Sequence, residues 1–357
     1  MLQLNYLGIR SLEWRDVPIP SLPDDNAVIV RPLTVSTCDY DGLMIHQGKL
    51  QMLHRHGPIP LGHEGEGVVI NVGDNVSRFA VGDRVIMPWK IACGTCPSCA
   101  RKQTAQCQTV PPEDSYSWGS KGGHWGGFLS DAVVVPWADY MLTPLPSGVD
   151  PILACGVADN ITDGWRAVAP GLKERPGGTV LVVGSEPPGS IGLYAAGIAK
   201  SLGAGRVVYA DHDIGRLEIA EKLGAEPFDL KSNSLDDYKT DLRTLVGGFD
   251  ITVDSSGSPK LLAALISATS RGGVCTSPSG VLYIGNDPTF PLFEMYRKSI
   301  SFHTGWVHTH TIIDEPLALI ASGKFDPSPV TTKVATWENA IDILIEPFTK
   351  VIISRPA

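Results

Sequence analysis

Residues 179–192 read Thr-Val-Leu-Val-Val-Gly-Ser-Glu-Pro-Pro-Gly-Ser-Ile-Gly. The apolar run 179–183 predicts a buried strand, and the glycine-rich loop after it opens a helix that we expect over 191–202. Glycines let a backbone turn tightly and approach a pyrophosphate, whose charge the helix N-terminus stabilises. The stretch therefore predicts the first strand–loop–helix unit of a dinucleotide-binding sheet, with loop contacts from Gly184, Gly189, Ser190, Ile191 and Gly192.

The loop departs from the usual Gly-x-Gly-x-x-Gly fingerprint, because only Gly189-x-x-Gly192 fits it and the part that starts at Gly184 is longer. Asp211 strengthens the interpretation. It follows the next predicted strand, where an acidic side chain accepts hydrogen bonds from the adenine ribose. A carboxylate there also repels a 2′-phosphate, which favours NAD over NADP, although Arg216 could turn toward such a phosphate.

The chain from about residue 151 to residue 291 continues as strands that alternate with amphipathic helices. A further helix is predicted at 214–223, and further strands at 206–210, 249–253, 273–275 and 281–284. Alternation of this kind builds βαβ units and a parallel sheet. We therefore predict a Rossmann domain, with a doubly wound parallel sheet, over 151–291.

The first 150 residues show a different pattern, in which glycine, proline and aspartate break short β-type runs such as 27–30, 67–72 and 83–87. Such spacing is typical of an antiparallel, barrel-like domain. After about residue 291 the chain is expected to return to this domain and to end in a strand at 350–354. The predicted domains are thus 1–150 with 292–357, and 151–291.

Composition restricts the partners. The chain has 357 residues, of which 43% are hydrophobic and 19% charged, and its formal net charge is −9. The excess of acidic residues and the lack of a Lys/Arg run argue against nucleic acid or an anionic membrane as the partner. The first residues do not resemble a signal peptide, and no apolar run is long enough to span a bilayer. We expect a cytoplasmic protein with reduced thiols.

Four of the seven cysteines lie close together, at Cys93, Cys96, Cys99 and Cys107. This spacing lets four thiolates close a tetrahedron around zinc, and four cysteines are a common structural zinc site. The alternatives are a pair of disulfides or a redox Cys-x-x-Cys. A disulfide pair needs an oxidising compartment, and a redox dithiol needs only two of the four thiols. A structural zinc lobe is therefore the favoured interpretation.

Three motifs carry a resemblance to a known family. They are Gly62-His63-Glu64-Gly65-Glu66-Gly67 with the following Gly73 and Val76, then the cysteine lobe, then Phe128 after Gly126-Gly127. In this order and spacing they resemble the zinc-containing medium-chain dehydrogenases/reductases, the superfamily of alcohol, polyol, glucose and formaldehyde dehydrogenases. The resemblance covers nearly the whole chain. It implies a GroES-like β-barrel catalytic domain beside the Rossmann domain.

The resemblance also implies a catalytic zinc. Cys38, in a Cys-x-x-Asp context, and His63 match the first two ligands, and Glu64 matches the residue that in some relatives displaces the zinc-bound water. The third ligand lies five residues before a glycine followed by an aromatic residue, which gives Asp159. Ligand chemistry alone would favour the softer Cys155. The segment 159–165 resembles the branch that contains glutathione-independent formaldehyde dehydrogenase, which uses aspartate here.

A zinc ion with an open position acts as a Lewis acid on an alcohol or carbonyl oxygen. Relatives usually carry Ser or Thr two residues after the cysteine ligand and a histidine three residues further on, as a proton relay. Here these positions hold Tyr40 and Leu43, so we expect the Tyr40 phenol to carry the proton, with His46 as a possible substitute. Trp89 falls where the family places a substrate-pocket aromatic residue, and with Tyr40 it predicts an apolar wall.

The remaining cysteines and histidines suggest no second active centre. Cys155 and Cys275 are interpreted as small packing residues. His308 and His310 follow Gly305-Trp306, where the chain is expected to pass near the cofactor, and they are interpreted as surface or loop histidines.

Together these features predict an NAD-dependent zinc alcohol dehydrogenase with two zinc ions per chain. Its substrate would be a small-molecule alcohol, hydrophobic or aromatic, primary or secondary, or the matching carbonyl. The resemblance implies a homodimer or homotetramer. A polyol, sugar or aldehyde dehydrogenase of the same superfamily is the alternative. A catalytically silent nucleotide-binding structural protein is disfavoured, because such relatives generally lack the zinc ligands.

Overall fold

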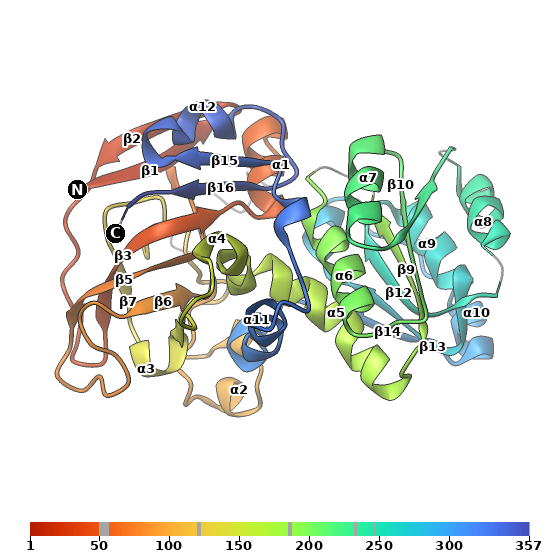
Figure 1. The fold of residues 1–357 in the computed structure, drawn as a ribbon, viewed down its shortest axis with the longest axis horizontal. Helices are drawn as coiled ribbons and strands as arrows, with labels where there is room; N and C mark the ends of the chain where they lie inside the picture. The colour runs from red at the N-terminus through yellow and green to blue at the C-terminus, as the bar shows by residue number, and fades with distance from the viewer. Residues whose placement is uncertain (50–56, 120–122, 185–187, 232–233, 246, 357) are drawn as a thin grey trace. The chain divides into compact units, whose positions relative to one another are not determined.

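The computed structural model describes residues 1–49, 57–119, 123–184, 188–231, 234–245 and 247–356. Its contacts divide the chain into two compact units (Figure 1). We call Met1–Thr162, His308–Ser322 and Thr331–Ala357 the barrel unit, and Asp163–Val307 with Gly323–Val330 the Rossmann unit.

The barrel unit is built on a seven-stranded sheet in the order β15-β16-β3-β5-β6-β8, with β7 also paired to β3. Its strands are β3 (Val28–Ser36), β5 (Glu64–Val72), β6 (Arg84–Met87), β7 (Val133–Val135), β8 (Thr143–Pro144), β15 (Lys333–Thr336) and β16 (Val351–Ser354). A second sheet has the order β2-β1-β4, from β1 (Leu2–Gly8), β2 (Ser11–Asp16) and β4 (Ile59–Pro60). Except for β15 with β16, the pairs are antiparallel, which confirms the predicted GroES-like barrel.

The helices of the barrel unit are short, and two of them position the candidate site. Helix α1 (Asp39–Gln47) begins after Cys38, whose backbone N–H is capped by Asp41, and it ends at Gly48 in the left-handed region. The turn η3 (Cys155–Ala158) leads through Asp159 into α5 (Asn160–Glu174). The others are α2 (Pro97–Ala100), η2 (Thr104–Gln106), α3 (Ala138–Met141), α4 (Pro151–Ala154), η5 (Thr309–Thr311), α11 (Asp314–Ala321), η7 (Trp337–Asn339) and α12 (Ala340–Leu344).

The Rossmann unit contains a six-stranded sheet in the order β11-β10-β9-β12-β13-β14, and every pair in it is parallel. Its strands are β9 (Thr179–Gly184), β10 (Arg206–Asp211), β11 (Glu226–Asp229), β12 (Phe249–Ser255), β13 (Thr269–Ser277) and β14 (Ser301–Thr304). The connecting helices are α6 (Ser190–Ser201), α7 (Ile214–Lys222), α8 (Leu235–Thr244), α9 (Pro259–Ala268) and α10 (Leu292–Lys298), with short turns η4 (Gly280–Tyr283) and η6 (Ser328–Val330). The predicted doubly wound parallel sheet is confirmed.

One predicted strand of this unit is wrong. Residues 281–284 were expected to be extended, but residues 280–283 form the turn η4. The Tyr283 hydroxyl donates a 2.8 Å hydrogen bond to Asp254, at the end of β12. This long-range contact holds the segment against the sheet as a turn, and an apolar run alone does not reveal it.

The domain boundaries also differ from those predicted at 150/151 and 291/292. The sequence did not predict strand β14. It pairs with β13, with Val274 opposite Ser301 and Ser277 opposite Thr304, so the Rossmann unit continues to Val307. At the other boundary, η3 contacts β3, β5 and β6, which keeps residues up to Thr162 in the barrel unit. No helix in the described ranges is long and apolar enough to cross a bilayer.

Candidate metal centres and dinucleotide site

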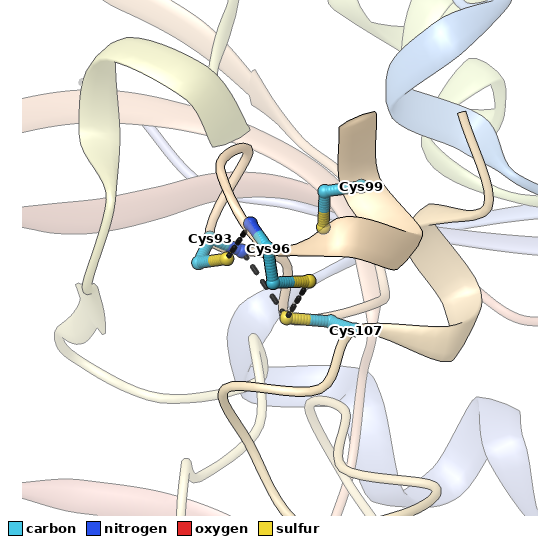
Figure 2. A group of neighbouring side chains, drawn as sticks. All are labelled: Cys93, Cys96, Cys99 and Cys107. Carbon is cyan, nitrogen blue, oxygen red and sulfur yellow. Dashed lines mark hydrogen bonds between the residues drawn. The ribbon is translucent and has the colours of Figure 1, made fainter. Parts of the chain in front are cut away.

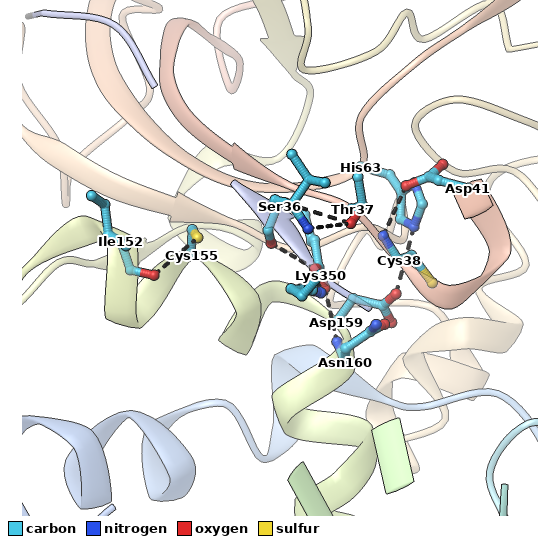
Figure 3. A network of polar contacts seen from close by, with 12 residues as sticks. Ser36, Thr37, Cys38, Asp41, His63, Ile152, Cys155, Asp159, Asn160 and Lys350 are labelled. Carbon is cyan, nitrogen blue, oxygen red and sulfur yellow. Dashed lines mark hydrogen bonds and ion pairs between the residues drawn. The ribbon is translucent and has the colours of Figure 1, made fainter. Parts of the chain in front are cut away.

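Three side chains from separate elements of the barrel unit converge on one point (Figure 3). Cys38 precedes α1, His63 precedes β5, and Asp159 joins η3 to α5. One ligand atom from each residue (a sulfur, a ring nitrogen and a carboxylate oxygen) lies within 4.8 Å of the other two. Oδ2 of Asp159 is 3.6 Å from Nε2 of His63. The residues predicted as the catalytic zinc ligands are therefore brought together.

The chemistry of this group fits a bound zinc ion. His63 is fully buried, and within the described part of the chain neither of its ring nitrogens has a hydrogen-bond partner. Burial lowers the pKa of His63, so the imidazole is neutral, as a metal ligand must be. Burial and the neighbouring Asp159 carboxylate raise the pKa of the Cys38 thiol well above its ordinary value. A buried thiolate next to a carboxylate is unfavourable because both groups are negative. A bound cation offsets these charges and so favours the thiolate.

Asp41 lies beside two of the three ligand residues. Its Oδ2 accepts the backbone N–H of Cys38 at 2.8 Å, and its Oδ1 lies 3.8 Å from Nδ1 of His63. The 3.8 Å separation is too long for a hydrogen bond, so this carboxylate acts on the Nδ1 side of the ring only through its charge. Sequence reasoning used Asp41 only as part of the Cys-x-x-Asp context, although its spacing from Cys38 was the signal for this role.

The cysteine lobe forms the second metal centre (Figure 2). The sulfur atoms of Cys93, Cys96, Cys99 and Cys107 lie within 4.8 Å of one another, and all four residues are free thiols. Backbone N–H groups donate to these sulfurs, such as Cys96 to Cys93 at 3.3 Å. Burial raises the pKa of Cys93, but hydrogen bonds from Thr109 and the backbone outweigh it and lower the pKa to about 6. Hydrogen bonds also lower the pKa of Cys96, whereas burial raises the pKa of Cys99. Cys93 and Cys96 are thus favoured as thiolates, the form that binds zinc.

In the dinucleotide loop, Gly189 adopts a left-handed conformation, with φ of 80°, and caps α6. Ser190, Ile191 and Gly192 form the first turn of that helix, as predicted for pyrophosphate contacts. Residues 185–187 lie outside the described residues. A Cβ on Gly184 would lie 2.3 Å from the Tyr209 hydroxyl, so only glycine fits above that side chain.

Asp211, which the sequence predicts to accept hydrogen bonds from the adenine ribose, already has several donors within the protein. It is fully buried, and Arg216 donates to its two oxygens from Nε and Nη2, both at 2.7 Å. The Tyr209 hydroxyl donates at 2.8 Å, and the backbone N–H groups of His212 and Asp213 donate at 2.7 and 3.0 Å. These donors fill the acceptor positions of the carboxylate. Arg216 is held against Asp211 by its two hydrogen bonds.

Two family models match this chain: the alcohol dehydrogenase GroES-like domain over residues 24–147 and the zinc-binding dehydrogenase domain over residues 190–322. The glutathione-independent formaldehyde dehydrogenase of Pseudomonas aeruginosa is 31% identical over 86% of this chain and 82% of its own length. The chain belongs to the zinc-containing medium-chain dehydrogenases/reductases. It is a zinc-dependent oxidoreductase of that superfamily, and the cysteine lobe is its structural zinc site.

Two further similarities span almost the whole chain. The zinc-type alcohol dehydrogenase-like protein AdhB of Bacillus subtilis is 28% identical over 95% of this chain and 94% of its own length. The solved structure of alcohol dehydrogenase TADH from Thermus sp. ATN1 has a TM-score of 0.86 and 28% identity, and the match covers 99% of each chain. The order of the barrel and Rossmann segments along the chain is therefore that of alcohol dehydrogenases.

Cys155, the alternative third ligand, stands apart from the ligand group of this dehydrogenase (Figure 3). Its sulfur donates to the Ile152 carbonyl at 3.6 Å within the same short helical segment. The side chain is fully buried, and burial raises its pKa to about 12. It has the environment of a packing residue, as the sequence interpretation proposed.

Glu64 is next to the ligand His63, but other groups occupy its carboxylate. Oε1 accepts a 2.6 Å hydrogen bond from Ser36 and pairs with the Lys350 ammonium, and Oε2 accepts the backbone N–H of Asn160 at 2.9 Å. Glu64 and Lys350 are both fully buried. The sequence placed Lys350 only at the start of a strand and missed this pairing, which fixes Glu64 behind the three ligands.

An aromatic cluster lies against the ligand group. Tyr40 stacks on Trp118 with ring centroids 4.7 Å apart, and Trp89 lies 5.6 Å from the same indole. Trp118 also meets the His63 ring edge-on at 4.4 Å. The two predicted wall residues, Tyr40 and Trp89, thus meet through a third aromatic residue that the sequence analysis missed. Burial raises the pKa of the Tyr40 phenol above its ordinary value.

The three other histidines considered in the sequence analysis have packing or hydrogen-bond contacts away from the three ligands. Nε2 of His46 is 2.9 Å from the Leu344 carbonyl, and its ring packs on Phe348, so the structure gives no support to His46 as a substitute relay. His308 and His310, which were interpreted as surface or loop histidines, lie at η5 in the barrel unit, and the ring nitrogens of His310 are buried. There His308 accepts the backbone N–H of Ala105 in the zinc lobe, and His310 stacks on Tyr140.

Proposed function

We propose that this dehydrogenase transfers a hydride reversibly between an apolar alcohol and NAD, with the matching carbonyl as the other product. The observation that carries the proposal is the convergence of Cys38, His63 and Asp159 within 4.8 Å, with both imidazole nitrogens unbonded in the described structure. Three protein ligands leave the fourth position of a tetrahedral zinc to water or substrate, which is the pattern of a catalytic site.

The residues around the metal have distinct parts in this reaction. Zinc bound there supplies a Lewis acid for the oxygen of the alcohol or carbonyl. Cys38 and Asp159 bring two negative charges that balance a divalent cation, and Asp41 lies 3.8 Å from Nδ1 of His63. The Glu64–Lys350 pair adds no net charge behind the ligands. Tyr40, two residues after Cys38, has the hydroxyl that we propose carries the proton.

The aromatic cluster supports an apolar substrate rather than a polyol or sugar. Tyr40, Trp89 and Trp118 present ring faces and edges. A polyol site needs side chains that pair each substrate hydroxyl, because unpaired buried hydroxyls are costly. An aldehyde is the second candidate, since the formaldehyde dehydrogenase of Pseudomonas aeruginosa and the formaldehyde dismutase of Pseudomonas putida, at 31% and 28% identity, are both similar to this chain.

NAD is the proposed cofactor, although Asp211 is buried. Arg216 pairs with Asp211 and also lies 3.9 Å from Asp213, whose side chain is half exposed. Two carboxylates against one guanidinium leave a net negative charge at the end of β10. Such a charge disfavours the 2′-phosphate of NADP.

We also propose a homodimer or homotetramer in the cytoplasm. Helix α10 precedes β14, the edge strand of the Rossmann sheet, and exposes Leu292, Phe293 and Tyr296 by 72%, 78% and 82%. A second copy that covers these side chains would remove apolar area from water. All seven cysteines are free thiols, which suits a reducing compartment.

Metal analysis combined with a substrate panel tests the function. Protein purified without chelators should contain about two zinc ions per chain, one for each group. With linear alcohols, benzyl alcohol and sorbitol, NADH absorbance should appear with the apolar alcohols, more slowly with NADP in place of NAD, and not with sorbitol. One zinc ion per chain, or turnover of sorbitol alone, would contradict the proposal.

A further inference from the structure

Trp118 makes ring contacts with Tyr40, Trp89 and His63. It stacks on Tyr40 with an interplanar angle of 26° and meets His63 at 77°. The indole is 7% exposed. Centroid separations of 4.4 and 4.7 Å are contact distances for aromatic rings, so no atom fits between Trp118 and either neighbour.

The backbone around Trp118 is held by specific hydrogen bonds. Ser117 donates its N–H to the Gly126 carbonyl at 2.8 Å and its hydroxyl to the Gly62 carbonyl at 3.0 Å, next to His63. Ser117 itself has a φ of 73°, in the left-handed region that is unfavourable for a residue other than glycine. The hydrogen bonds offset this cost. They tie the residue before Trp118 to the residue before the ligand His63.

The indole N–H of Trp118 is buried, yet it has no hydrogen-bond partner in the described structure. A tryptophan that only fills a core usually finds a partner for this group. A buried donor without an acceptor is unfavourable, because it has lost its hydrogen bonds to water. An acceptor brought by the substrate beside His63 would satisfy it.

We infer that Trp118 is a specificity-determining residue: its ring sets the upper size of the substrate, and its N–H donates to the oxygen of the bound alcohol or carbonyl. The inference rests on the proposed function and narrows it from apolar alcohols in general to short ones. Trp118 contacts both Tyr40 and His63, so the space that the indole fills is closed to the substrate. The carbon chain of the substrate must therefore lie beside the indole.

Two substitutions separate the two roles. Trp118→Ala removes the ring, so kcat/KM for 1-hexanol relative to ethanol should rise by about tenfold or more, as discrimination by a few methylene groups allows. Trp118→Phe keeps an aromatic ring but has no N–H, so kcat/KM should fall by about tenfold for every alcohol while the hexanol-to-ethanol ratio changes little. Trp14→Ala is the matched control, since Trp14 packs on Trp337 outside this cluster.

The zinc content and melting temperature of each variant check its folding, and Trp118→Leu replaces the alanine variant if that protein loses zinc. An unchanged hexanol-to-ethanol ratio in a folded, zinc-loaded Trp118→Ala or Trp118→Leu protein overturns the size limit. An unchanged kcat/KM in Trp118→Phe overturns the hydrogen bond. Failure of the wild-type protein to reduce NAD with any alcohol contradicts the proposed function instead, so the two failures are distinguishable.

Discussion

Oδ2 of Asp159 lies 3.6 Å from Nε2 of His63, although Cys155 is a softer donor only four residues earlier. The difference arises at the junction of η3 and α5. Cys155 lies in the first helical turn and donates to Ile152, whereas the chain at Asp159 leaves helical geometry, with φ and ψ of −155° and −82°. This change of direction carries the carboxylate to Cys38 and His63.

Asp159→Ala should therefore remove about one zinc ion per chain and nearly all turnover, because a catalytic site with two protein ligands holds zinc poorly. Cys155→Ala should keep both zinc ions and most of the activity, with a packing cost of about 1–2 kcal/mol. Elemental analysis and steady-state rates on both variants test this. The opposite pattern, with Cys155 essential and Asp159 dispensable, would assign the ligand to Cys155.

The Glu64–Lys350 pair gives a second prediction, on stability. Lys350→Met leaves the buried Glu64 carboxylate without its cation, which should lower the free energy of unfolding by about 3–5 kcal/mol. Glu64→Gln combined with Lys350→Met removes both charges and should recover much of that loss. Urea unfolding of the zinc-loaded proteins measures the coupling. Additive losses from the two single substitutions would show that the pair contributes no specific interaction.

Cofactor preference should respond to Asp213. Asp213→Ser removes the net negative charge at the end of β10, while the serine hydroxyl keeps the cap on Arg216 N–H at the start of α7. The ratio of kcat/KM for NADP to that for NAD should rise by about tenfold. Asp211→Ser is the comparison: it disrupts the buried network and should also lower the melting temperature. An unchanged ratio in Asp213→Ser would show that this charge does not select the cofactor.

The sequence predicted those parts of the site whose ligand residues belong to motifs with a fixed spacing. Cys93 to Cys107 form one local loop, and the three catalytic candidates were located by family motifs. The strands β9 and β10 were likewise predicted to within a residue, because short apolar runs between glycines define them. Local patterns of this kind need no knowledge of distant contacts.

The features that the sequence missed depend on pairs far apart in the chain. Lys350 meets Glu64 across 286 positions, and Trp118 reaches Tyr40 and His63 through a loop without regular structure. Asp211 was correctly placed at a strand end, but its burial depends on Tyr209 and Arg216 turning inward. Periodicity predicts which face of an element is buried, and it does not predict which polar groups meet there.

His310 provides a prediction on pH. Its ring nitrogens are buried and have no hydrogen-bond partner in the described structure, and burial, aided by His308, lowers its pKa to about 3. The unfolded chain, with a histidine pKa of about 6.5, then binds one proton more than the native protein between these values. The contribution of neutral His310 to the free energy of unfolding is therefore fully present above pH 6.5, and it is lost as the pH falls below that value.

His310→Phe keeps the ring stacked on Tyr140 and cannot be protonated. From pH 6.5 down to pH 4.5, the free energy of unfolding of the wild-type protein should fall more steeply than that of the variant, by at most about 1.4 kcal/mol per pH unit for one proton. Acid loss of zinc thiolates affects both proteins, so the difference between the two slopes isolates His310. Guanidinium unfolding at several pH values measures it, and parallel slopes would show that His310 does not remain neutral in the native protein.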